Sequence, residues 1–137
     1  MKKQDINTLS KIWLDASLKA HDFISKQYWL ENKILMEEKY LPNAEVYIAL
    51  NEDEIYGFVA LVENHLASIF VCNEHQGKGI GSLLLRHVKE LRLKLTLNVY
   101  QKNTNSIGFY RSNNFEIIAE SIDESIGEKE FIMQWKK

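Results

Sequence analysis

A glycine-rich hexapeptide is the part of this sequence whose residue types and spacing most clearly indicate chemistry. It reads Gln76-Gly77-Lys78-Gly79-Ile80-Gly81 and lies between an apolar segment and an amphipathic one. Glycines let a backbone pass close to a bulky anion, and the unpaired amides at a helix start attract negative charge. We therefore predict that the amides of residues 76 to 82, including that of Ser82, bind a diphosphate, with Lys78 assisting by its charge.

Other interpretations of these glycines fit less well. A P-loop needs two glycines separated by four residues and followed by Lys and Ser or Thr, and this pattern is absent. A dinucleotide fingerprint that starts at Gly77 needs a glycine or alanine where Ser82 stands, and belongs to an early βαβ unit. The third alternative is a flexible turn that binds nothing.

Hydrophobic periodicity predicts two helices in the first third of the chain. Apolar residues recur at steps of three and four over residues 5–20. Ser25 is a suitable cap for a second helix over residues 26–40, and Pro42 marks its exit. The apolar side of this second helix is expected to comprise Trp29, Leu30, Ile34, Leu35 and Met36.

The rest of the chain reads mainly as strands. Segments rich in β-branched and aromatic residues, alternating patterns and turn residues predict the following order: a hairpin of residues 46–50 and 55–62, a central strand 66–72, a helix from residue 80 to about 91, a strand 94–100, a helix 104–111, and strands 115–121 and 129–135 joined by a turn at Gly127. Because strands and helices do not alternate throughout, a doubly wound nucleotide-binding fold is disfavoured.

Composition narrows the class of protein. The chain has 137 residues, enough for one core, so we expect a single domain over residues 1–137. A net charge of -2 without a basic stripe argues against nucleic acid, and the apolar runs are too short to cross a bilayer. The lone Cys72 and the scattered histidines indicate neither a disulfide framework nor a metal site. We expect a cytoplasmic protein.

Two motifs together resemble those of a known superfamily. Gln76, Gly79 and Gly81 match Gln or Arg, two residues, Gly, one residue, then Gly or Ala. Asn103-Thr104-Asn105-Ser106-Ile107-Gly108-Phe109-Tyr110 matches a second pattern that ends in an aromatic pair. The chain thus resembles the GNAT superfamily of N-acetyltransferases over nearly its whole length, and within it a small bacterial branch of the YiaC/YjaB type.

The resemblance implies an α+β fold, the GNAT-like acyl-CoA N-acyltransferase fold. A mixed central sheet of about six strands would be flanked by about four helices. Only Met1 to Gln4 precede the first helix, so the usual first strand must be short or missing. The implied reaction moves an acetyl group from acetyl-CoA, without a metal, to a primary amine of a small molecule, a peptide N-terminus or a protein lysine.

Direct attack of the amine in a ternary complex is the implied mechanism, in a monomer or a homodimer. Tyr110 matches the position that protonates the departing thiolate. The strand Ser68 to Val71 would offer backbone hydrogen bonds to the cofactor. The expected cofactor-binding residues are Phe70, Val71, Gln76, Gly77, Lys78, Gly79, Ile80, Gly81, Ser82, Asn103 and Phe109.

The general base is left open by the sequence. No carboxylate lies within residues 66–72, where some relatives carry one, so Glu63, His65 and His21 are all candidates. Trp13 and Trp29 suit either an aromatic acceptor wall or the core. The missing carboxylate also keeps a second function open, a catalytically silent module that binds acyl-CoA as a sensor or partner protein.

Overall fold

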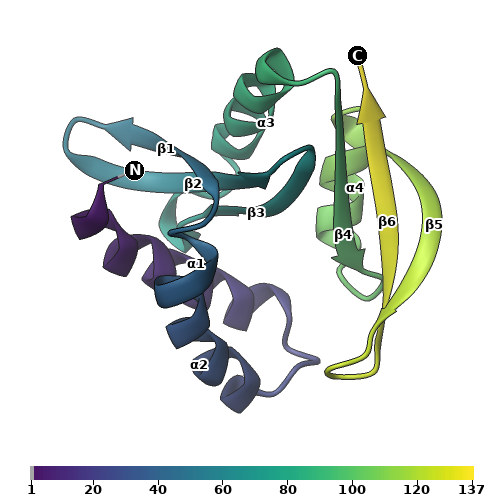
Figure 1. Cartoon of the computed structure of the whole chain (residues 1–137), viewed down its shortest axis with the longest axis horizontal. Helices are drawn as coiled ribbons and strands as arrows, with labels where there is room; N and C mark the ends of the chain where they lie inside the picture. The colour runs from purple at the N-terminus through teal and green to yellow at the C-terminus, as the bar shows by residue number, and fades with distance from the viewer. Residues whose placement is uncertain (1) are drawn as a thin grey trace.

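A single mixed sheet of six strands organises the molecule (Figure 1). The computed structural model describes residues 2–137, and Met1 lies outside the described part. The strands are β1 (Glu45–Asn51), β2 (Glu54–Val62), β3 (His65–Val71), β4 (Lys94–Tyr100), β5 (Glu116–Asp123) and β6 (Glu128–Lys136). Their order across the sheet is β1-β2-β3-β4-β6-β5. All neighbours are antiparallel except β3 and β4, which are parallel.

Four α-helices flank this sheet. They are α1 (Ile6–Ala20), α2 (Lys26–Leu35), α3 (Ile80–Leu91) and α4 (Thr104–Ser112). Three shorter helical turns accompany them: η1 (Lys3–Asp5), η2 (Met36–Tyr40) and η3 (Asn73–His75). Within residues 2–137 no strand precedes α1, as expected for a first strand that is short or missing. Over the same residues, no helix combines the length and apolar character needed to cross a membrane.

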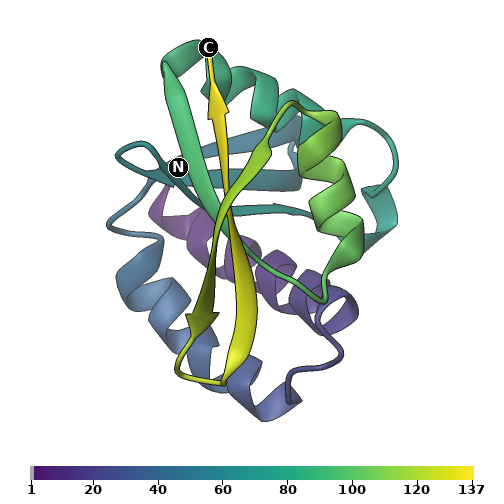
Figure 2. The same cartoon turned by 90° about the vertical axis from the view of Figure 1, so that its right-hand side faces the viewer.

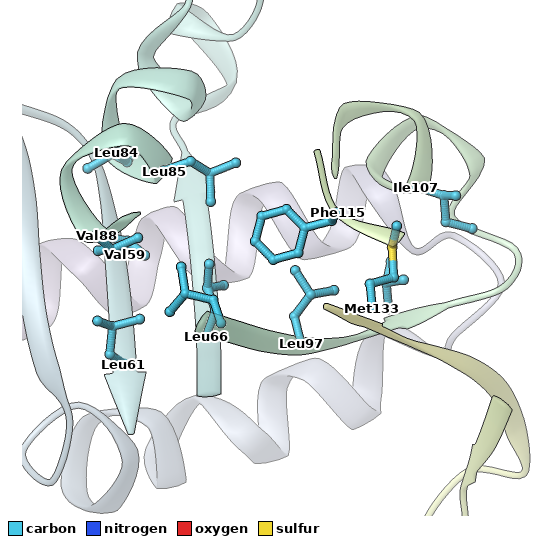
Figure 3. Packing of buried hydrophobic residues seen from close by; sticks show 12 residues of the cluster. Val59, Leu61, Leu66, Leu84, Leu85, Val88, Leu97, Ile107, Phe115 and Met133 are labelled. Carbon is cyan, nitrogen blue, oxygen red and sulfur yellow. The ribbon is translucent and has the colours of Figure 1, made fainter. Parts of the chain in front are cut away.

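The two faces of the sheet carry separate hydrophobic clusters. Alternation along β2 sends Val59 and Leu61 to the cluster beneath α3 and α4, and Phe58 and Ala60 to the cluster beneath α1 and α2. We call these the α3–α4 core and the α1–α2 core. Figure 3 shows the α3–α4 core, where Phe115 lies among side chains from α3, β3 and β4. A ligand that passes through the sheet would therefore meet both clusters.

The parallel strands β3 and β4 separate almost as soon as they meet. His65 and Thr96 form their one paired position, after which the strands diverge (Figure 1). On its other side β3 is paired with β2 along most of its length. The edge of β3 that faces β4 is thus left without a strand partner beyond its first residues. We call the wedge between these strands the slot.

The second helix differs from its prediction. The Ser25 side chain accepts a hydrogen bond from the Tyr28 amide at 3.3 Å, as expected for a cap. The regular helix nevertheless ends at Leu35 and continues as the wider turn η2. Of the five residues expected on its apolar side, Trp29 and Met36 are buried, whereas Leu30, Ile34 and Leu35 are exposed. Apolar residues occupy more of the helix circumference than its one packed side can bury.

Most other predicted elements are confirmed. The first hairpin, the alternating β4, α3 and α4 lie within a few residues of their expected bounds. Leu95, Leu97 and Val99 of β4 are buried, as their spacing predicted. Gly127 lies in the turn between β5 and β6, with a φ of 71° that favours glycine. Figure 2 shows the long twisted hairpin that these two strands form beside β4.

Candidate active site

A cavity of about 1160 Å³ occupies the slot and extends to both faces of the sheet. It is bounded by β3 and β4, the start of α3, α4, the end of α1 and the loop that follows it. The sequence-predicted residues that line it are His21, His65, Phe70, Val71, Gln76, Gly77, Gly79, Ile80, Gly81, Ser82, Asn103, Phe109 and Tyr110. The structure thus brings together most of the residues selected from the sequence.

The glycine loop, residues 76–82, presents backbone amides to this cavity. Gly77 and Gly79 have φ angles of 79° and 83°, in the left-handed region where a side chain is strained. Gly79 precedes the first turn of α3, and the Leu83 amide donates to its carbonyl at 3.1 Å. The amides of residues 80–82 therefore precede the first closed turn and lack helical acceptors. They are available for an anion at the positive end of the helix dipole.

Gly81 connects the two sequence motifs. A Cβ atom built on Gly81 would lie 3.0 Å from the Cζ atom of Phe109. The Phe109 ring in turn lies 5.4 Å from that of Tyr110, centroid to centroid. Close approach of α3 and α4 at this small residue therefore fixes the position of Tyr110 relative to the glycine loop.

The positive charge beside the loop comes from a residue that the sequence did not indicate. Lys19, in the last turn of α1, lines the cavity and donates to the Gln76 side chain at 3.4 Å. Gln76 also donates to the Val71 carbonyl at 3.1 Å, which ties the loop to the end of β3. Lys78, expected to assist the phosphates, is exposed and outside the lining, with its amine 3.4 Å from Nδ1 of His75.

Tyr110 has the properties of a proton donor. Its side chain is half-buried and lines the cavity, and its hydroxyl has no hydrogen-bond partner among residues 2–137. Burial raises the pKa of Tyr110 above its usual range, so the phenol stays protonated at neutral pH. A nearby thiolate could accept that proton.

His21 and Asn103 form a buried polar pair on the other side of the sheet. The Asn103 Oδ1 atom caps α4 by accepting from the Ser106 amide at 3.2 Å, so its Nδ2 atom faces His21 Nε2 at 3.0 Å. Nε2 must then be the acceptor, and the imidazole proton resides on Nδ1. Burial lowers the pKa of His21 to about 4, so the ring is neutral at physiological pH.

Aromatic rings surround this pair. The His21 ring stacks on Trp29 at a centroid distance of 5.2 Å and meets the edge of Tyr100 at 5.3 Å. Trp13 contacts Trp29 edge to face at 5.5 Å. Both tryptophans belong to the α1–α2 core and also line the cavity. We call His21, Trp29 and Tyr100 the aromatic wall.

Two base candidates are poorly placed. Glu63 lies in the tight turn between β2 and β3, where its φ is 57°, and it is exposed and outside the cavity lining. That turn projects from the sheet and does not bring the carboxylate to the slot. His65 lines the cavity at the closed end of the slot, where its Nδ1 atom lies 3.0 Å from the Thr96 hydroxyl. Burial lowers the pKa of His65.

Two carboxylates that the sequence analysis did not select lie at the aromatic wall. Asp22 follows His21 at the mouth of the cavity, and Glu130 on β6 lies directly opposite Tyr100 on β4. The Tyr100 hydroxyl donates to a third, Asp123, at 2.9 Å. The alternation of β6 could have indicated which face Glu130 occupies, but only the strand pairing places it at Tyr100.

Potential metal ligands gather at one point of the described chain. Cys72, Glu74 and His75 have ligand atoms within 4.8 Å of one another. His75 is already engaged, since its ring stacks on Tyr56 at 3.7 Å and its Nε2 atom lies 3.7 Å from Glu54. Burial raises the pKa of the Cys72 thiol and disfavours the thiolate that binds metals. We assign no metal to these residues.

Comparison with known proteins agrees with this geometry. A family model described as an acetyltransferase (GNAT) domain matches residues 42–117. The peptidyl-lysine N-acetyltransferase YiaC of Escherichia coli (strain K12) is 30% identical over 135 residues, which cover 98% of this chain and 92% of YiaC. The peptidyl-lysine N-acetyltransferase YjaB of Salmonella typhimurium is 33% identical over 120 residues, 87% of this chain and 82% of YjaB.

A solved structure gives the same result. The solution structure of apo-form YjaB from Escherichia coli superimposes with a TM-score of 0.88 and 28% identity, over 98% of this chain and 93% of that one. These matches argue against the dinucleotide-binding alternative and favour an enzyme over a silent binding module. The chain belongs to the GNAT family of acetyltransferases and is an acetyl-CoA-dependent N-acetyltransferase.

Proposed function

We propose that this acetyltransferase modifies the side-chain amine of lysine residues in proteins, by direct attack on acetyl-CoA within a ternary complex. The observation that carries the proposal is the slot, which has the glycine loop at one end and the aromatic wall with its carboxylates at the other. Support for the acceptor comes from the names of YiaC and YjaB, which are peptidyl-lysine N-acetyltransferases.

In this proposal the diphosphate of acetyl-CoA binds the amides of residues 80–82, with Lys19 supplying a countercharge. The pantetheine arm then extends along the edge of β3 that has no strand partner, where Phe70 and Val71 line the cavity. An extended chain with amide groups suits an unpaired strand edge, because both offer backbone-type hydrogen bonds. The thioester thereby comes to lie in the slot.

The two faces of the sheet would then have different tasks. Tyr110 and Phe109 pack against the α3–α4 core, whereas Tyr100 and Phe70 pack against the α1–α2 core. We assign the departing thiolate to the Tyr110 side, where the protonated phenol donates to sulfur. The amine approaches from the aromatic wall, which suits the apolar stem and the cationic head of lysine. Amides on the free edge of β3 would stabilise the oxyanion of the tetrahedral intermediate.

We further propose that the enzyme works in the cytoplasm. One cysteine in 137 residues provides no internal disulfide, as is usual for proteins of reducing compartments. A net charge of -2 suits a freely soluble enzyme that meets many protein substrates.

The direct test is transfer of the acetyl group to a lysine-containing peptide. Purified chain, acetyl-CoA and the peptide should release free thiol and raise the peptide mass by one acetyl group. A peptide with its N-terminus free and its lysine replaced by norleucine tests the competing acceptor, an α-amine. Acetyl-CoA binding without thiol release for any amine would support the silent module instead, and transfer to the α-amine alone would contradict lysine as the acceptor.

A further inference from the structure

Two carboxylates line the cavity, those of Asp22 and Glu130, and neither has a task in the mechanism so far. We infer that Glu130 binds the ammonium group of the acceptor and takes its proton before attack. The inference rests on the proposed function, because it names the residue that prepares the amine for that transfer. A bound lysine is an ammonium ion at neutral pH and cannot attack until it has lost a proton.

Strand register places Glu130 beside the open part of the slot. Glu130 pairs with Tyr100, and Thr96 pairs with His65 at the point where β3 and β4 meet. Tyr100 lies four residues beyond Thr96, and Ile69 lies four residues beyond His65. Glu130 therefore lies at the level of residues 68–71, the strand edge to which we assign the thioester. His65 lies about 13 Å back along the strand, at about 3.3 Å per residue.

Glu130 also has free hydrogen-bonding capacity. Its Oε1 atom has two long contacts of 3.4 Å, from the Asn98 side-chain amide and the Ser121 hydroxyl. Its Oε2 atom has no partner within residues 2–137. Asp123 is saturated by comparison, since it accepts from the Tyr100 hydroxyl at 2.9 Å and from the amide and hydroxyl of Ser125 at 3.1 and 2.6 Å. Asp22 is exposed at the mouth of the cavity, whereas Glu130 is half-buried.

The other base candidates are engaged or displaced. The free lone pair of His21, on Nε2, already accepts a hydrogen bond from Asn103. His65 is bound to Thr96 at the closed end of the slot. Glu63 lies outside the cavity lining. Among these residues, Glu130 alone combines a place in the open cavity with an unoccupied acceptor atom.

The proton and electron balance is as follows. The acceptor ammonium gives one proton to the Glu130 carboxylate and becomes a neutral amine. Its lone pair forms the new C–N bond, the C–S bond breaks, and Tyr110 protonates the leaving sulfur. The attacking nitrogen carries two protons after the C–N bond forms; one of them restores the Tyr110 hydroxyl and the other stays on the product amide, and Glu130 releases its own proton to solvent. The sum is one amide, one thiol and one proton from one ammonium ion and one thioester.

Several titratable groups share this region and bear on the pH dependence. They are Tyr28 from α2, Tyr100 from β4, Lys102 just after β4, Asp123 from β5, Glu128 from β6, and His21 with Asp22 from the loop after α1. Tyr100 and His21 are uncharged at neutral pH because burial opposes their charged forms and shifts each pKa. Glu128 is neutralised by its ion pair with Lys102 at 3.3 Å. The charge that faces the acceptor therefore comes from the cavity-lining carboxylates of Asp22 and Glu130, and it favours an ammonium ion.

The test compares E130Q with E120Q in the full chain. Glu120 lies on the neighbouring strand β5, is exposed and is not part of the cavity lining, so its substitution is a matched control. We expect E130Q to lower kcat/KM for a lysine peptide about 100-fold or more at pH 7.5. Its affinity for acetyl-CoA should stay within about twofold of wild type, and E120Q should match wild type in both respects.

Three further readouts separate proton removal from a structural effect. In E130Q the rate should rise about tenfold per pH unit below the pKa of the acceptor amine, because only the free amine reacts. A peptide with the lysine isostere S-(2-aminoethyl)cysteine, whose amine is less basic, should lose less activity in E130Q. E130D, which keeps the carboxylate, should recover part of the rate.

Each outcome decides between the two proposals. If wild type transfers acetyl groups and E130Q keeps its rate and pH profile, the role of Glu130 is wrong and the acetyl transfer stands. If E130Q loses the same factor of kcat/KM for the lysine peptide and the S-(2-aminoethyl)cysteine peptide, and also binds acetyl-CoA more weakly, the role of Glu130 is structural instead. If wild type binds acetyl-CoA but acetylates neither the lysine peptide nor the S-(2-aminoethyl)cysteine peptide, both proposals are wrong.

Discussion

The two ends of the cavity are built in different ways. The end to which we assign the cofactor, hereafter the cofactor end, is one continuous stretch, the glycine loop at residues 76–82, and it offers mainly backbone amides. The acceptor end takes side chains from segments far apart in the sequence: His21, Trp29, Tyr100 and Glu130. Backbone chemistry depends on local spacing, whereas a side-chain pocket depends on how distant segments pair. If these assignments hold, the acceptor end is the part of the cavity where specificity can differ.

The two ends also differ in charge. Lys19 lies beside the glycine loop, together with the positive end of the α3 dipole. Asp22 and Glu130 lie at the aromatic wall. An anionic diphosphate and a cationic amine would thus be drawn to opposite ends, with the thioester between them. The following predictions test whether the two ends can be disabled separately.

The largest effect is expected from Gly79→Val, which should weaken acetyl-CoA binding about 1000-fold, or about 4 kcal/mol. Gly79 has a φ of 83°, and a β-branched residue would force the loop out of this conformation. Gly127→Val is the matched control, because Gly127 has a φ of 71° but lies in the β5–β6 turn. Calorimetric titration should find near wild-type affinity for Gly127→Val, and equal losses in both variants would contradict the assignment.

Tyr110→Phe should slow the acetyl-transfer step without changing the binding of acetyl-CoA. We expect kcat to fall about 100-fold, because the thiolate loses its proton donor. Affinity for acetyl-CoA should not change, since the ring and its packing against Phe109 are kept. Tyr40→Phe, at an exposed position on η2, is the control. Thiol release measures both variants, and a Tyr110→Phe enzyme with full kcat would remove the phenol from the mechanism.

His21 makes the stability of the acceptor end depend on pH. Burial holds its folded-state pKa at about 4, below the ordinary value of 6.5, so the unfolded chain takes up this proton first as pH falls. The contribution of neutral His21 to the free energy of unfolding is fully present above pH 6.5 and is lost toward pH 4. The loss is on the order of 2 kcal/mol. Urea unfolding should show that the free energy of unfolding falls less between pH 7.0 and 4.5 in His21→Gln than in wild type. The glutamine does not titrate, and its amide oxygen can still accept from Asn103. Parallel losses would contradict a neutral buried imidazole.

The smallest effect is expected at the start of α2. Ser25→Ala removes the hydrogen bond to the Tyr28 amide and should lower the free energy of unfolding by about 1 kcal/mol. Acetyl-CoA affinity should be unchanged, because α2 contributes to the acceptor end only. A change in cofactor affinity with Ser25→Ala would mean that the two ends are coupled through the α1–α2 core.

The difference between the ends explains what could be predicted from the sequence. Alternation in β4, the period of α1 and the glycine spacing are local signals, and each predicted its element correctly. The two-motif resemblance added Phe109 and Tyr110, which line the same cavity as the glycine loop. A signal within a few residues of chain was sufficient in each of these cases.

The remaining features depend on contacts between distant segments. Lys19 reaches Gln76 across 57 residues of sequence, and no periodicity indicates that pair. Glu130 is placed by the pairing of β6 with β4, a register that the sequence of β6 alone does not define. Glu63 was selected for its position before β3, but the turn leaves it outside the cavity. The exposed side of α2 was missed because apolar residues there exceed what α1 can cover.

The most direct test of the account is a crystal structure of the chain with coenzyme A. We predict that the diphosphate lies within hydrogen-bonding distance of the amides of residues 80–82, and that the pantetheine arm follows β3 through the slot. Its sulfur should lie near the Tyr110 hydroxyl, with the aromatic wall and Glu130 facing it from the other side of the sheet. A cofactor bound outside the slot, or a sulfur remote from Tyr110, would contradict the account.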